Sequence, residues 1–134
     1  MKKSTISVLS IVLLCTVLWL TGCNSYSSSY QAVGFVHSSR SDAASMSFFA
    51  FKGTMVFKLR CKQDAEKVLT YSATLESGNM TVYYAYDESK IELFSIDSGD
   101  DINASQPLPQ QGTVYIIVET DEKCENGALR FSIE

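Results

Sequence analysis

The chain has 134 residues, of which 46% are hydrophobic, enough for one modest core but not for a second domain. Its 11 basic and 15 acidic side chains give a net charge of −4 at pH 7. Because the phosphate backbone of a nucleic acid binds positively charged surfaces, this balance argues against nucleic acid as a partner.

The first 22 residues have the organisation of a secretory signal. Lys2 and Lys3 form a positively charged start, and fifteen mostly apolar residues follow from 6 to 20. This run is shorter than the roughly 18 residues that a membrane-spanning helix needs, and small residues follow it, as at a cleavage site. We therefore expect residues 1–22 to be a signal peptide. Its removal leaves nine basic and 15 acidic side chains, a net charge of −6.

The end of this signal, Leu20-Thr21-Gly22-Cys23, resembles the bacterial lipobox, in which a small residue precedes an invariant cysteine. The resemblance implies that Cys23 receives a diacylglyceryl group and becomes the first residue of the mature chain. A lipoprotein of this kind, with acyl chains of the palmitate class, is anchored on the extracytoplasmic side of the cell membrane. Two acyl chains give stable attachment, whereas one binds only marginally. The alternative is an ordinary secretory signal with a chance cysteine.

Residues 23–45 are predicted to be a flexible tether. Nine of the 24 residues from Asn24 to Ser47 are serine, and such a composition is typical of a linker. Four side chains are more apolar than a linker requires, and the alternative is that they dock on the following domain: Tyr26, Tyr30, Phe35 and Val36.

Residues 46–134 are predicted to form an all-β domain, a small antiparallel β-sandwich. Apolar and polar side chains alternate with a period of two, as in half-buried strands, and no window has a helical period. Turn-forming residues at 76–79, 87–90 and 121–127 separate the expected strands. The residues expected to face the core are Met55, Phe57, Leu59, Leu69, Tyr71, Ala73, Leu75, Met80, Val82, Tyr84, Tyr86, Leu129, Phe131 and Ile133.

The segment 97–103, "DSGDDIN", is a candidate calcium site because calcium prefers hard oxygen ligands. Its spacing does not fit an EF-hand, and the same residue types are ordinary turn formers. The whole connection 97–112 is long for a hairpin, so it is either a binding loop, a crossover between sheets, or a segment that contains a further short strand. The candidate ligands are Asp97, Asp100, Asp101 and Asn103.

After removal of the signal and lipidation of Cys23, Cys61 and Cys124 are the remaining cysteines. Outside the cytoplasm such a pair is usually a disulfide, and this one would close a loop of about 63 residues. If the strand ending at Cys61 and the strand after Cys124 are antiparallel neighbours, the two thiols meet at the same end. The alternative is a pair of buried, unbonded cysteines.

Three stretches, "FKGTMVFKL", "VLTYSATLESGNMTVYYAYDESKIELFSI" and "QGTVYIIVETDEKCENGALRFSI", are similar to a group of small Gram-positive, often clostridial, lipoproteins. The similarity consists of turn glycines and strand alternation, and it covers most of residues 46–134. It implies a β-sandwich lipoprotein and brings no established biochemical activity.

No enzyme and no cofactor are expected. The only histidine, His37, lies in the predicted tether, where a catalytic base would not be held in register with a nucleophile. Acidic pairs such as Asp87 with Glu88 fall in predicted turns, where charges are normally solvated.

Three tyrosines crowd one predicted strand, and alternation places one of them on the opposite face from the other two. Tyrosine is enriched at recognition surfaces, although its strand propensity explains it equally well. We therefore predict a non-enzymatic interaction module that binds an envelope or extracellular protein. The alternative is an accessory protein that binds a glycan, a small solute or calcium. The candidate binding residues are Tyr83, Tyr84 and Tyr86.

Overall fold

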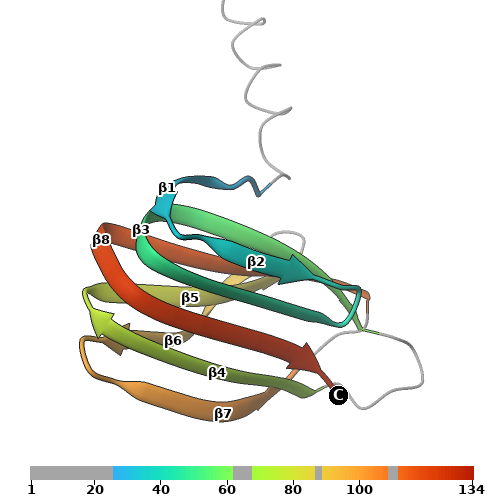
Figure 1. Cartoon of the computed structure of the whole chain (residues 1–134). Coiled ribbons are helices and arrows are strands. Elements are labelled where there is room, and N and C mark those ends of the chain that lie inside the picture. The colour runs from blue at the N-terminus through green and yellow to red at the C-terminus, as the bar shows by residue number, and fades with distance from the viewer. Residues whose placement is uncertain (1–25, 62–67, 87–88, 109–111) are drawn as a thin grey trace, which may run out of the picture.

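The computed structural model describes residues 26–61, 68–86, 89–108 and 112–134. Its elements are all strands, and they form an antiparallel β-sandwich (Figure 1), so the predicted fold class is confirmed. In the part of the chain that the structure describes, no helix has the length and apolarity to span a membrane. The strands are β1 (Ser29–Val33), β2 (Val36–Ser39), β3 (Ala43–Cys61), β4 (Val68–Ser77), β5 (Asn79–Tyr86), β6 (Ser89–Asp97), β7 (Asp101–Pro107) and β8 (Gly112–Ile133).

The sandwich is built from long segments that cross from one layer to the other. β3 and β8 pair along almost their whole length. β8 pairs with β5 through its first half and with β4 through its second half. The first layer therefore contains β2, the start of β3, the end of β8, β4 and β7. The second layer contains β1, the end of β3, the start of β8, β5 and β6.

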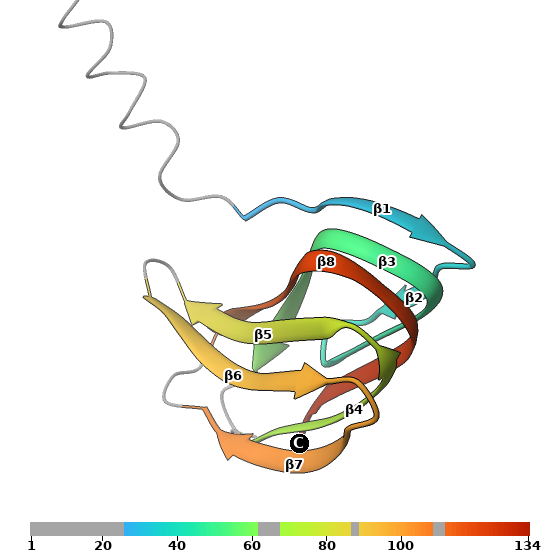
Figure 2. The same ribbon diagram turned by 90° about the vertical axis from the view of Figure 1, so that its left-hand side faces the viewer.

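The crossings occur at a few special backbone positions. β4 continues into β5 through a bend (Figure 2), and β1 into β2 and β6 into β7 do the same. In β8, residues 121–123 form a bulge, because all three lie opposite the single residue Lys52 of β3. Bends and bulges of this kind let a strand leave one sheet and enter the other. Glycines with positive φ lie at these same crossings: Gly34, Gly78 and Gly99 in the three bends, and Gly53 next to the bulge.

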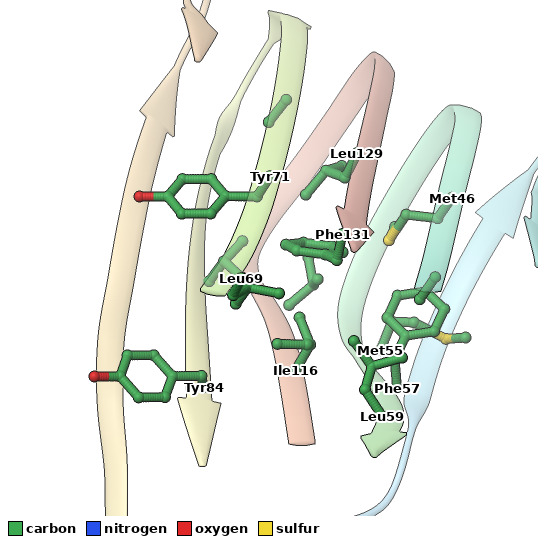
Figure 3. Close-up of a cluster of buried hydrophobic side chains, with 14 of the residues drawn as sticks. Met46, Met55, Phe57, Leu59, Leu69, Tyr71, Tyr84, Ile116, Leu129 and Phe131 are labelled. Carbon is green, nitrogen blue, oxygen red and sulfur yellow. The ribbon is translucent and has the colours of Figure 1, made fainter. Parts of the chain in front are cut away.

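The core lies between the two layers and confirms the predicted alternation. Each of the residues expected to face the core is buried, whereas Lys58, Arg60 and Arg130 between them are exposed. Figure 3 labels Leu69 and Tyr71 of β4 and Leu129 and Phe131 of β8 in this cluster, and these two strands are neighbours in one layer. The inward faces of these strands therefore follow from the sequence.

Two of the predicted turns differ from the structure. The turn predicted at 121–127 is wrong, because β8 runs through this segment and only bulges there. A bend does occur at Gly78, but the strands on either side pair with β8 and not with each other. The connection 97–112 contains β7, which confirms the alternative of a further short strand. The turn predicted at 87–90 lies partly outside the described residues.

The flexible tether predicted for residues 23–45 is wrong in its described part. β1 and β2 both pair with β3, so the domain begins well before residue 46. Tyr30 and Phe35 stack on the buried ring of Phe51, at centroid distances of 5.5 and 5.7 Å. The apolar side chains of this segment therefore dock on the domain in spite of its linker-like serine content, which is the alternative given for residues 23–45. The signal peptide and Cys23 lie outside the described residues.

The predicted Cys61–Cys124 disulfide is also wrong. Cys61 lies opposite Gly112 at the end of β3, whereas Cys124 lies opposite Phe51. Phe51 and Cys61 are ten residues apart, about 33 Å along an extended strand, and a disulfide needs Cα atoms within about 7 Å. Both cysteines are buried, and no disulfide joins them. The prediction fails because it places Cys124 at the start of a strand, whereas the residue lies in the middle of one.

Candidate functional site

The outer face of the first layer is covered mainly by short side chains. Because Ala44, Met46 and Phe48 point into the core, their neighbours on β3 point outward. In register with those neighbours, the adjacent strands also present hydroxyl, amide or methyl groups. Short side chains leave the surface of a sheet open to a ligand or a partner. The short outward residues are Ser38, Ser45, Ser47, Ser72, Thr74, Asn103 and Ala128, and the longer Arg130 lies between Ser45 and Ser72 in register.

A shallow hollow of about 830 Å³ lies on this face. It is lined by the β1–β2 connection, by Ser47–Phe49 of β3, by Thr74 and by the segment 126–128 of β8. A second hollow of about 280 Å³ lies further along the same strands and includes Arg40 and Arg130 in its lining. The face therefore combines many hydrogen-bonding groups with positive charge at one end.

Two large apolar side chains border the larger hollow and are mostly exposed. Phe49 is 68% exposed and Val36 is 67% exposed. The Phe49 ring lies against Gly34, where a Cβ atom would come within 2.1 Å of it. A glycine at this bend thus makes room for the ring at the surface. Exposed large apolar side chains beside a hollow are typical of an interaction site, whereas single exposed ones need no explanation.

Of the three tyrosines predicted as a binding surface, only Tyr83 lies on an outer face. Tyr84 and Tyr86 are each 6% exposed and belong to the core, so they are not surface residues. Tyr83 lies on the outer face of the second layer, with the Lys90 ammonium 4.3 Å from its ring centroid. Lys90 also forms an ion pair with Glu119 at 2.7 Å. Alternation separates Tyr83 from the other two in the sequence, but it does not say which face is outside.

The predicted calcium ligands are used in a bend between β6 and β7. Asp100 Oδ2 accepts a hydrogen bond from the Asp97 backbone N–H at 2.9 Å, and Asp97 Oδ1 accepts one from the Asn79 side chain. Asp101 and Asn103 lie in β7, opposite Thr74 and Ser72. Within the described ranges, no three His, Cys, Asp or Glu side chains are grouped so that they could hold a metal ion. The turn-forming explanation accounts for this segment.

Cys124 is buried at the layer crossing and is not an activated nucleophile. Burial raises the pKa of its thiol, a backbone hydrogen bond with Asn79 opposes the rise, and the charge of Glu122 adds to it. The thiol donates to the Asn79 carbonyl at 3.3 Å. His37 is exposed in β2 and stacks near Phe35, far in sequence from this thiol. The structure does not bring the two together as a Cys–His pair.

The raised pKa of Cys124 predicts a loss of stability at alkaline pH. The folded state holds this proton more tightly than the unfolded chain, so the stabilisation is fully present below the unfolded pKa of about 8.5 and falls as the pH rises through the folded value. Urea unfolding of the wild type and of Cys124→Ala between pH 7 and 10 measures the difference in their free energies of unfolding. We expect this difference to be constant up to about pH 8.5, and above that pH we expect the wild type to lose stability relative to the variant. A difference that stays constant up to pH 10 would contradict this.

The comparisons with known proteins find a likeness among solved structures alone. No protein-family model matches the chain, and no curated protein is significantly similar to it. Among solved structures, it is similar to the pre-peptidase C-terminal domain of a collagenase from Bacillus anthracis, with 17% identity, a TM-score of 0.48, and coverage of 72% of this chain and 91% of that one. It is also similar to PliG, a periplasmic inhibitor of g-type lysozyme from Aeromonas hydrophila, with 18% identity, a TM-score of 0.44, and coverage of 70% and 88%. A family 29 carbohydrate-binding module is similar with 10% identity, a TM-score of 0.40, and coverage of 82% and 84%.

Proposed function

We propose that this protein is a membrane-anchored bacterial lipoprotein whose domain binds an envelope or extracellular protein without acting as an enzyme. The lipobox-like end of the signal supports the anchor at Cys23. The outer face of the first layer supports the binding role, and the single observation that carries it is Phe49, 68% exposed beside a hollow whose lining includes the hydroxyl groups of Ser47 and Thr74.

A protein partner fits this face better than a small ligand does. Protein interfaces combine a few apolar anchors with a polar surround, and most of the binding energy comes from the anchors. Phe49 and Val36 are such anchors, and the serines, Thr74 and Arg130 supply the surround. A glycan is the second candidate, favoured by the same hollow, because hydroxyl groups and an aromatic ring also suit sugars.

The proposal predicts that Phe49→Ser abolishes capture of the partner. In a cross-linking pull-down from intact cells, loss of an anchor worth about 2 kcal/mol should lower recovery of the partner at least about tenfold. The matched control is Ile91→Ser, which removes a 43% exposed apolar side chain from β6 in the other layer and should leave recovery unchanged. Cys23→Ala, which cannot be lipidated, controls for location.

Equal recovery of one partner by the native chain and by Phe49→Ser would overturn the assignment of this face. If the native chain captures no protein, a glycan becomes the leading candidate, and binding of the native chain and Phe49→Ser to a glycan array tests it. Thermal unfolding of each variant checks that the exposed substitutions leave the fold intact.

A further inference from the structure

A second, smaller apolar cluster lies outside the sandwich core, on the outer face of the second layer. Ile117 is 2% exposed and Ala85 is fully buried, yet neither belongs to the main core. Alternation points both of them outward, since Ile116 and Tyr84 beside them face the core. Ile117 pairs in register with Val56 and Tyr83, and Ala85 pairs with Tyr115. Aromatic and apolar side chains on this face therefore cover one another.

The beginning of the described chain is fixed to this same face. The Tyr26 ring lies 5.2 Å from the Tyr115 ring, centroid to centroid. Ser28 Oγ accepts a hydrogen bond from the Val56 backbone N–H at 2.9 Å. Ser28 therefore continues the line of β1 along the edge of β3, and from this edge the Tyr26 ring reaches the outside of the second layer. We call the surface formed by Tyr26, Tyr83 and Tyr115 the tyrosine face.

Two lysines border the tyrosine face. Lys58 lies opposite Tyr115 in register, and Lys90 lies beside Ala85 and over Tyr83. Lys90 is paired with Glu119, and Glu92 lies opposite Tyr83 in register, so two lysines and two glutamates leave the face close to neutral in spite of the negative charge of the whole mature chain. Tyrosine rings with flanking lysines are the side chains that settle at the boundary between lipid and water.

The proposed anchor places a membrane next to this face. Cys23 precedes Tyr26 by three residues, which span at most about 11 Å when fully extended. A lipid attached to Cys23 holds that residue at the bilayer surface, where the headgroup region on each side is about 5–7 Å thick. Because the attachment is covalent, the face meets the bilayer at high effective concentration, and even weak adhesion is enough to orient the domain.

We infer that the tyrosine face rests on the lipid headgroups of the membrane in which Cys23 is anchored. This inference depends on the proposed lipidation and extends it, because it sets the orientation of the domain. The outer faces of the two layers point in opposite directions, so Phe49 and the hollow then face away from the membrane, towards a partner.

The test uses the lipidated chain reconstituted into phosphatidylcholine vesicles with brominated acyl chains, which quench tryptophan fluorescence near the bilayer. The sole tryptophan of the sequence, Trp19, lies in the signal peptide. A processed chain carrying Tyr115→Trp therefore reports on the tyrosine face alone, and Phe49→Trp is the matched reporter on the opposite face. The unmodified chain gives the background.

We expect brominated lipid to lower the fluorescence of Tyr115→Trp at least about twofold and that of Phe49→Trp by less than about a tenth, because interfacial side chains lie within about 5–10 Å of the headgroup boundary. Equal quenching of the two reporters, or stronger quenching of Phe49→Trp, would overturn the inference. Co-flotation with the vesicles is measured first. A chain that floats with neither reporter quenched refutes the orientation alone, whereas a chain that does not float refutes the anchor and the orientation together.

Discussion

Gly78→Ala is expected to lower the free energy of unfolding by more than about 3 kcal/mol, a large part of the stability of a domain of this size. Gly78 has a φ of 111°, which side chains rarely adopt, and a Cβ atom there would lie 2.8 Å from Cys124 Cα and 2.6 Å from Cys124 Sγ. The backbone of β8 cannot move aside without disturbing the crossing between the layers. Urea unfolding of the mature chain measures the loss.

Gly99→Ala separates backbone strain from the clash. Gly99 also has a positive φ, of 84°, but a Cβ atom added there would meet no other atom within 4 Å. We expect this variant to lose only about 1–2 kcal/mol, the cost of the backbone conformation alone. Equal losses in the two variants would show that the approach of Gly78 to β8 contributes nothing.

The inward faces of the strands could be predicted from the sequence because they depend on local alternation. A period of two decides which side chains share a face, and one buried face is enough to set the choice. Residues such as Leu69, Phe131 and Met80 therefore lie where the sequence predicts.

The paths of the strands could not be predicted in the same way. A glycine with positive φ looks the same in the sequence whether it reverses a strand or bends it into another sheet, because only the pairing partners differ. At Gly78 that choice depends on β8, and in residues 121–127 of β8 it depends on β3 and β4, so in both places the deciding strands are distant in sequence. The disulfide prediction fails for this reason, since it places Cys124 at a strand end.

The candidate site could not be predicted for a related reason. Alternation counted back from Phe51 would bury Phe49, whereas alternation counted forward from Met46 exposes it, and the change of phase occurs near the layer crossing. The useful signal is the run of serines, whose composition is equally typical of a tether. In the structure several of these serines form the outward face of β2 and β3, where short polar side chains leave the sheet uncovered.

Phe51→Ala is expected to destabilise the domain by about 3–5 kcal/mol, because it removes a fully buried aromatic ring. The ring also holds β1 and β2 in place through Tyr30 and Phe35, and it contacts Phe48 at a centroid distance of 5.4 Å. Its loss should therefore weaken the N-terminal strands more than the remainder of the sheet. Amide hydrogen exchange measures this as reduced protection in β1 and β2, beyond the global loss.

Phe57→Ala is the matched control. Phe57 is 2% exposed, and its ring lies 6.3 Å from Phe131 in the core, centroid to centroid. For this variant we expect a similar global loss of stability but no selective loss of protection in β1 and β2. The same exchange pattern in both variants would contradict the role given to Phe51.

Because the connection at Gly34 supports Phe49 and the segment before β1 carries Tyr26, both proposed faces depend on these strands. Phe51→Ala should consequently weaken partner capture and quenching of the Tyr115→Trp reporter together, whereas Phe49→Ser should affect capture alone.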